Sequence, residues 1–195
     1  METILSFKVG DYLDESKFEC VRNDRFMFNK PSGCLWGSTY TPNEDFPSKW
    51  VEWGIYEEFF NTNEDFNGLI YSLKLDSRVL RIETAEDFIH LLLPFYTIFG
   101  KLIKYGSFRK DYICDAYCSF EDIAKSYDAM HISDNVIHYF RGSDVFKKLR
   151  SDGLIIEYNG FDTMDVESWI LFNLNCIDES SIKYVDLNYV KKKIL

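Results

Sequence analysis

The stretch that most constrains the fold is residues 30–39, KPSGCLWGST. A proline and a glycine near its start favour a turn, and Cys34–Thr39 predicts a short strand that ends in two hydroxyl side chains. Two prolines then mark a loop, and Ser48 is a suitable N-cap for a helix over residues 49–61. This part of the chain is therefore expected to fold as turn, strand, loop and helix.

Outward from this stretch, the hydrophobic pattern predicts a mixture of strands and helices. The expected strands cover residues 4–9, 69–75, 78–82, 154–158, 168–173 and 182–185, where 69–75 and 78–82 are either two strands or one strand with a bulge. The expected helices cover residues 85–93, with a bend at Pro94 and a continuation to Phe99, and residues 120–130 and 143–150. Residues 105–119 have no steady period and are expected to be irregular.

The composition predicts one domain over residues 1–195. The chain is 46% hydrophobic and 17% aromatic, so it can bury one sizeable core in which rings fill much of the space. It has no internal repeat, low-complexity segment or linker that would divide it. A mixed α and β fold is the expected class.

Charge and cysteine usage limit the partners and the compartment. A formal net charge of -10 argues against binding of bulk nucleic acid, which needs clustered basic residues. The longest apolar run, near residues 91–99, is shorter than the ~20 residues of a membrane-spanning helix. Five scattered cysteines do not form a disulfide pattern. We therefore expect a cytoplasmic protein with reduced thiols and no membrane association.

Two stretches carry a family resemblance. The first is residues 30–39 with Trp50 and Trp53, a pattern of the form K-P-x-G-x-L-W-x-S followed by W-x-x-W. The second is Tyr158–Phe161 followed by Asp165–Asn173. Together they resemble a group of small ADP-ribosyltransferase-like proteins of bacteria and their phages. The resemblance implies an α+β fold with a split, twisted two-sheet core and flanking helices, and NAD bound as a substrate between the sheets.

The resemblance also implies roles for particular residues. Ser38 would lie beside the nicotinamide ribose, and Glu167 would hold the ribose and stabilise the cationic transition state, with Asp165 as the competing carboxylate. Lys8 would supply the basic group of the first strand, although a lysine offers one point charge where an arginine offers a fork. The remaining cofactor contacts would be Trp36 or Tyr40 stacking on nicotinamide, and Thr39 or Ser38 holding the sugar.

The reaction that follows is transfer of ADP-ribose from NAD to a protein or another macromolecule. Cleavage of the nicotinamide bond develops an oxocarbenium-like ribose, which a fixed carboxylate favours. The leaving group departs neutral, so one acidic residue suffices and no metal is expected. The chain contains neither a Walker loop nor a G-x-G-x-x-G fingerprint, so another fold would have to bind the dinucleotide.

Structural roles remain open for the same residues. A glutamate before an apolar strand is often a solvated strand end, tryptophans are often core residues, and Lys8 also fits a plain strand lysine. A zinc site at Cys114 and Cys118 with His131 and His138 is disfavoured, because the histidines are seven residues apart.

Two other functions remain in view. The first is a catalytically inactive member of the same fold that acts as an interaction module for a protein partner or a nucleotide signal. The second is an acidic decoy of nucleic acid, which ranks last because the charges alternate with aromatic residues. The sequence does not indicate the acceptor or the oligomeric state.

Overall fold

The computed structural model describes residues 2–7, 13, 15–18, 20–23, 30–57, 65–101, 113–142 and 164–193. The strands are β1 (Thr3–Phe7), β2 (Arg22–Asn23), β3 (Pro31–Ser32), β4 (Leu35–Thr39), β5 (Asn67–Ser72), β6 (Val79–Ile82), β7 (Tyr96–Lys101), β8 (Ile113–Cys118), β9 (Ala129–Ile132), β10 (Ser168–Leu171) and β11 (Lys183–Asp186). The α-helices are α1 (Lys49–Tyr56), α2 (Ala85–Asp87), α3 (Phe120–Ser126) and α4 (Asp134–Gly142). The short turns are η1 (Glu15–Phe18), the π-type η2 (Phe88–Leu92), η3 (Leu93–Phe95), η4 (Leu174–Cys176), η5 (Glu179–Ser181) and η6 (Asn188–Lys193).

Seven strands form one sheet in the order β11-β5-β1-β4-β10-β9-β6. Neighbours are antiparallel except β6 and β9, which run parallel. The pairs β2–β3 and β7–β8 form separate two-stranded sheets. The expectation of a mixed α and β fold is confirmed.

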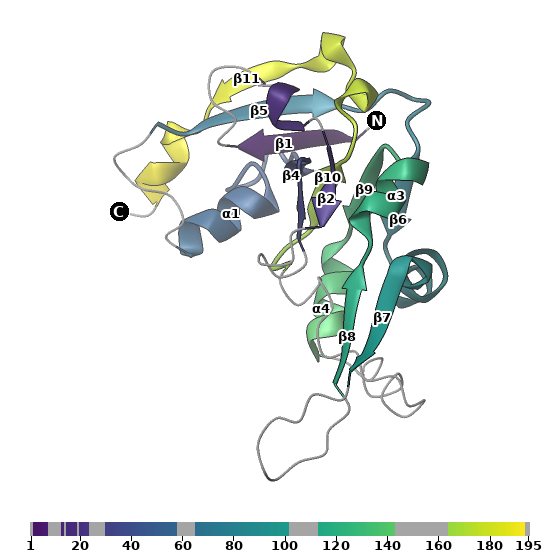
Figure 1. The fold of residues 1–195 in the computed structure, drawn as a ribbon. Coiled ribbons are helices and arrows are strands. Elements are labelled where there is room, and N and C mark those ends of the chain that lie inside the picture. The colour runs from purple at the N-terminus through teal and green to yellow at the C-terminus, as the bar shows by residue number, and fades with distance from the viewer. Residues whose placement is uncertain are drawn as a thin grey trace.

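Strand β4 joins two limbs of the large sheet. Its end at Ser38 and Thr39 pairs with β1, whereas its start from Leu35 to Gly37 pairs with β10. Figure 1 shows the limb β11-β5-β1 running across the limb β4-β10-β9. The sheet is therefore continuous but strongly bent. The end of β4 lies near the start of β10, and β9 lies on the other side of β10.

Gly37 allows the close approach of β1 to β4. A Cβ atom at this position would lie 2.7 Å from the Leu5 carbonyl oxygen and 2.8 Å from Cγ2 of Ile4. Only glycine fits where another backbone comes this near. Gly37, the second glycine of the KPSGCLWGST stretch, therefore allows β1 and β4 to approach this closely.

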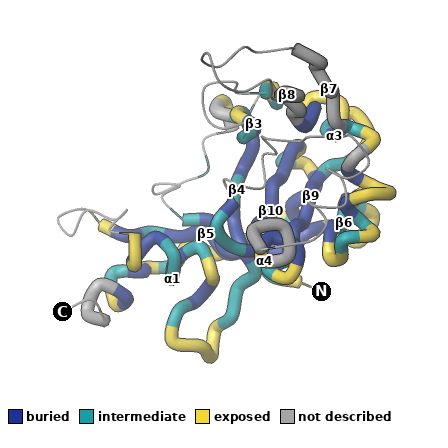
Figure 2. Tube along the Cα trace, turned by 90° about the horizontal axis from the view of Figure 1, so that it is seen from below, coloured by how far each residue is buried: buried dark blue, intermediate teal, exposed yellow. Residues whose placement is uncertain are grey.

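The bent sheet has apolar clusters on both faces, because successive side chains of a strand point to opposite sides. Figure 2 shows the central strands almost wholly buried. One face carries a cluster that includes Ile4, Leu35, Leu69, Tyr71, Trp169 and Leu171. The other face carries a cluster under α1 that includes Leu5, Val51, Ile55 and Ile70, and a cluster under α3 and α4 that includes Leu80, Ile82, Ile123, Met130, Ile137 and Ile170.

Local capping explains where two helices begin. The Ser48 hydroxyl accepts a hydrogen bond from the Val51 backbone N–H at 3.3 Å, which satisfies one of the free donors of α1. Thr84 and Asp87 form a reciprocal capping box at the start of α2. Both helix starts agree with the sequence prediction.

Three predicted segments differ from the structure. The helix expected to reach Phe99 ends at Phe95, and Tyr96–Lys101 is strand β7, paired with part of the segment expected to be irregular. The helix expected over residues 120–130 stops at Ser126, because residues 129–132 pair with β6 and β10 instead. Helix α4 was not predicted, and the elements expected at residues 143–150 and 154–158 lie outside the described residues.

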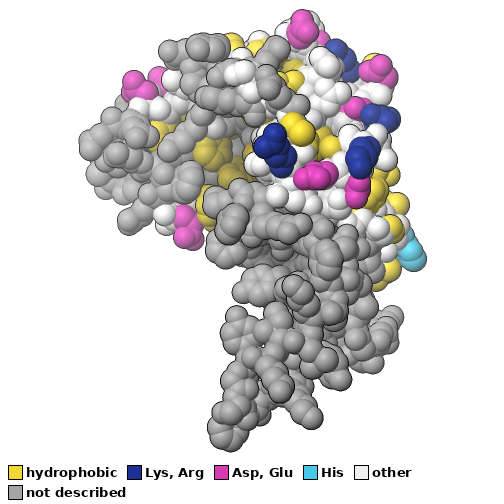
Figure 3. Space-filling model, in the orientation of Figure 1, with side chains coloured by type: hydrophobic (Ala, Val, Ile, Leu, Met, Phe, Trp, Pro, Cys, Tyr) yellow, Lys and Arg dark blue, Asp and Glu magenta, His cyan; other side chains and the backbone are white. Residues whose placement is uncertain are grey.

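Charges of both signs are interspersed on the surface. Figure 3 shows basic side chains beside acidic ones on the face that it draws. Ion pairs include Arg78 with Asp128 and Lys125 with Asp122. Within the described part of the chain, every helix is too short or too polar to cross a bilayer.

Candidate active site

Glu167 lies at the start of β10 and is held by donors from two neighbouring strands. The hydroxyl of Thr39 donates to Oε1 at 2.8 Å, and the Thr39 backbone N–H donates to Oε2 at 3.0 Å. His131 Nε2 lies 2.8 Å from Oε1. Asp134 Oδ1 accepts a hydrogen bond from the backbone N–H of Glu167. Both carboxylate oxygens therefore occupy fixed positions.

Trp169 extends this network on the same face of β10. Its Nε1–H donates to the Thr39 hydroxyl at 3.1 Å, so the hydroxyl proton is directed toward Glu167. The His131 ring stacks on the indole with centroids 4.4 Å apart and an interplanar angle of 25°. The guanidinium carbon of Arg81 lies 5.2 Å from the centre of the same indole. We call Thr39, Arg81, His131, Glu167 and Trp169 the Glu167 cluster.

The strand register explains why these residues meet. Trp169 pairs with His131, and His131 pairs with Arg81, so three side chains from β10, β9 and β6 form one cross-strand row. Thr39 comes from β4 on the other side of β10. The row is also tied to the start of β1, because Arg81 forms an ion pair with Glu2.

Glu167, His131 and Trp169 of the cluster are buried, whereas the Arg81 side chain is partly exposed. Glu167 is 8% exposed and His131 is 7% exposed. Within the described residues, His131 Nδ1 is the one buried side-chain nitrogen or oxygen without a hydrogen-bond partner, and it lies 4.0 Å from Oε1 of Glu83. The hydrogen bond from Arg81 holds the pKa of Glu2 below its usual value, against the effect of partial burial. Charges inside such a site act strongly because little water screens them.

A hollow of about 440 Å³ borders the cluster. Its lining residues are Glu2, Leu73, Lys74, Leu75, Ser77, Val79, Arg81 and Trp169. The volume falls in the range of about 300–1,000 Å³ typical of small-molecule sites. Trp169 and Arg81 therefore belong both to the lining of this hollow and to the Glu167 cluster.

The structure places Ser38 and Thr39 on opposite sides of β4, as strand alternation requires. Ser38 is fully buried, and its Oγ accepts a hydrogen bond from the Trp50 backbone N–H at 3.1 Å, at the start of α1. The resemblance implied that Ser38 meets Glu167. The hydroxyl that does so belongs to Thr39, one residue later, while Ser38 anchors a helix.

Trp36 and Tyr40 share the Ser38 side of the strand. The ring of Trp36 lies 6.0 Å from that of Trp50 and packs against the cluster under α3 and α4. Tyr40 packs against the cluster under α1. The aromatic ring that the structure brings to Glu167 is that of Trp169 instead. Lys8 lies outside the described residues.

Asp165 is not part of the Glu167 cluster. Burial lowers the pKa of Lys30, and the charge of Asp165 acts in the opposite direction, so this carboxylate lies within electrostatic range of Lys30. Of the two acidic residues that the sequence left open, Glu167 is the one held by Thr39 and His131.

Sequence reasoning missed His131, Trp169 and Arg81. Trp169 could have been found, because it follows Glu167 by two residues in a predicted strand and so shares its face. His131 was weighed only as a zinc ligand. The described residues contain no group of three or more His, Cys, Asp or Glu side chains placed to hold a metal ion.

None of three comparisons with known proteins, against family models, curated proteins and solved structures, finds a match. The functional argument therefore depends on the geometry of the Glu167 cluster and on the sequence motifs.

Proposed function

We propose that this protein is an NAD-dependent mono-ADP-ribosyltransferase with an α+β fold and with Glu167 as its catalytic carboxylate. The observation that carries the proposal is the hydrogen-bonded contact between Thr39 and Glu167. These residues come from the two motif stretches that resemble the transferase family, and they are 128 positions apart in the chain. Their meeting at one buried carboxylate is what a shared catalytic site requires.

The chemistry follows from a carboxylate fixed in a dry site. The bond between C1′ of the ribose and the nicotinamide nitrogen breaks, and its electron pair leaves with neutral nicotinamide. C1′ becomes oxocarbenium-like, and the Glu167 carboxylate stabilises this positive charge. A nucleophile of the acceptor then bonds to C1′ and loses its proton to solvent. A carboxylate already oriented by three donors needs little reorganisation during this step.

The hollow beside Trp169 borders the Glu167 cluster, and we place the diphosphate of NAD there. Its wall includes the cations of Arg81 and Lys74, which suit a diphosphate. Arg81 is held by Glu2, so binding of a diphosphate there would replace one anionic partner with another.

The test is NAD cleavage by purified protein, measured as nicotinamide release and as transfer of adenylate-labelled ADP-ribose to lysate proteins. We expect Glu167→Gln to lower the rate by about 10²–10³-fold, as loss of one preorganised charge at a transition state does. Glu86→Gln, at an exposed glutamate of α2, is the matched control and should behave as wild type. Equal turnover in Glu167→Gln and wild type would refute the assignment.

One observation favours a second candidate, an inactive interaction module of the same fold. The oxygens of Glu167 are bonded to the protein's own donors, and its side chain is only 11% exposed, as suits a structural carboxylate. In that case wild type would neither bind nor cleave NAD, and Glu167→Gln would lower only the free energy of unfolding. Nicotinamide release by wild type separates the two candidates.

A further inference from the structure

We propose that His131 is a positioning residue for Glu167, and that it acts as the neutral Nε2–H tautomer. This inference rests on the proposed transferase function and adds a residue to which no role was assigned from the sequence motifs. Its basis is a buried contact of 2.8 Å between His131 Nε2 and Glu167 Oε1.

The three donors around Glu167 reach its carboxylate from both sides of β10. The Thr39 backbone N–H binds Oε2, and the Thr39 hydroxyl binds Oε1, both from the β4 side. His131 binds Oε1 from β9, on the opposite side of β10. With Thr39 alone the carboxylate could swing away from β9. Donors from both flanking strands therefore fix the direction of Oε1.

His131 is itself held in place. Its ring stacks on the Trp169 indole at 4.4 Å, and the backbone of β9 is hydrogen-bonded between β10 and β6. The side chain is only 9% exposed. A buried ring fixed by stacking and by strand pairing can orient a neighbour without moving, and an error of about 1 Å in a reacting group can cost about 10²-fold in rate.

The tautomer follows from the partners of the two ring nitrogens. An ionised carboxylate only accepts hydrogen bonds, so Nε2 must carry a proton. In the neutral ring, Nδ1 is then a bare acceptor, and no donor contacts it among the described residues. In the imidazolium, Nδ1–H would point toward Glu83, whose Oε1 is 4.0 Å away.

The neutral form suits the reaction, because an imidazolium would cancel the charge that stabilises the oxocarbenium. The ionisable groups around the ring are Glu167 before β10, Glu83 after β6, Arg81 on β6 over the indole, and Glu2 on the β1 side, which pairs with Arg81.

Two substitutions of His131 separate the effect of its Nε2–H donor from the effect of its aromatic ring. His131→Phe keeps a flat ring that can stack on Trp169 but removes the donor. His131→Gln removes the aromatic ring but keeps an N–H donor at a similar distance from the backbone. His138→Gln, at an exposed histidine of α4, is the matched control.

We expect His131→Phe to lower kcat for NAD cleavage by about 10²-fold with KM for NAD changed less than about threefold. His131→Gln should recover at least a tenth of wild-type kcat at pH 8, about a tenfold gain over His131→Phe. His138→Gln should match wild type in both measurements. Full kcat in His131→Phe, with wild type active, would overturn the positioning role and leave the transferase proposal intact.

A second measurement does not depend on turnover. Ring-nitrogen NMR of ¹⁵N-histidine protein at pH 8 should show His131 with a protonated Nε2 and an unprotonated Nδ1, and the Nε2 resonance should shift in Glu167→Gln. A protonated Nδ1 with a bare Nε2 would refute the inference, even if His131→Phe fails to fold. If wild type shows the expected tautomer but cleaves no NAD, the transferase proposal fails, and the catalytic part of the inference fails with it.

Discussion

Thr39→Val tests the hydrogen-bond chain that joins Trp169 to Glu167. Valine has nearly the shape of threonine, so the substitution removes the hydroxyl and leaves little cavity. The hydroxyl donates to a carboxylate at 2.8 Å and accepts from the Trp169 Nε1–H at 3.1 Å. Trp169 is 1% exposed, so its N–H would lose its partner without gaining water.

The magnitude follows from these two bonds. A hydrogen bond to a charged acceptor contributes about 1.5–3 kcal/mol, and an unsatisfied buried donor costs about 1–3 kcal/mol. With partial relaxation, we expect Thr39→Val to lower the free energy of unfolding by about 2–4 kcal/mol. For a domain of this size, that corresponds to a fall in Tm of about 5–15 °C.

The assay is urea unfolding followed by far-ultraviolet circular dichroism, with Thr39→Ser as the matched variant. Serine keeps the hydroxyl and loses one methyl group, at a cost of about 0.8 kcal/mol. We expect Thr39→Ser to lie close to wild type and Thr39→Val well below it. If the two variants unfold within 0.5 kcal/mol of each other, on the order of the measurement error, the hydroxyl does not join the strands as described.

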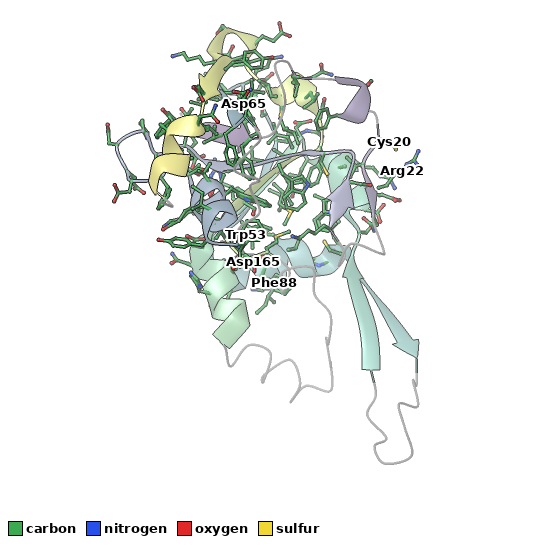
Figure 4. The ribbon with its side chains drawn as sticks, turned by 90° about the vertical axis from the view of Figure 1, so that its left-hand side faces the viewer. Cys20, Arg22, Trp53, Asp65, Phe88 and Asp165 are labelled. Carbon is green, nitrogen blue, oxygen red and sulfur yellow. The ribbon has the colours of Figure 1, made fainter. Side chains whose placement is uncertain are left out.

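Three further predictions concern other parts of the fold. Ser38→Ala leaves the Trp50 N–H of α1 without its acceptor and should lower stability by about 1–2 kcal/mol in thermal unfolding; no change would exclude the anchoring role. The hydrogen bond from Arg78 lowers the pKa of Asp128, so the stabilising effect of this carboxylate is present above about pH 4 and is lost as the pH falls through the lowered value; Asp128→Asn should therefore unfold more easily than wild type at pH 6, and the difference should shrink as the pH falls through that value. Burial raises the pKa of Cys34 to about 12, whereas Cys20 is exposed beside β2 (Figure 4), so maleimide at pH 7 should label Cys20 before Cys34, as peptide mass spectrometry can show.

Local patterns in the sequence were sufficient for elements whose residues decide their own conformation. Ser48 and Thr84 start helices because their side chains bind nearby backbone donors. Ala129 and Met130 show the opposite case, since the predicted helix over residues 120–130 included them and yet they belong to β9 (Ala129–Ile132). Strands on both sides offer it hydrogen bonds, and all four residues are buried between them. Tertiary pairing outweighed local propensity there.

The features of the candidate site can also be separated into those that the sequence predicted and those that only the tertiary structure decided. The sequence by itself determined the mixed α and β class, the strand at residues 35–39, and Glu167 as a carboxylate next to an apolar strand. Only the tertiary structure decided that Thr39 rather than Ser38 contacts Glu167, and that His131, Trp169 and Arg81 join them. The physical reason is strand register. Adjacent residues of a strand point to opposite faces, so a shift of one position would turn the side chain that faces the site toward the core on the other face. That register is set by strands far apart in the chain.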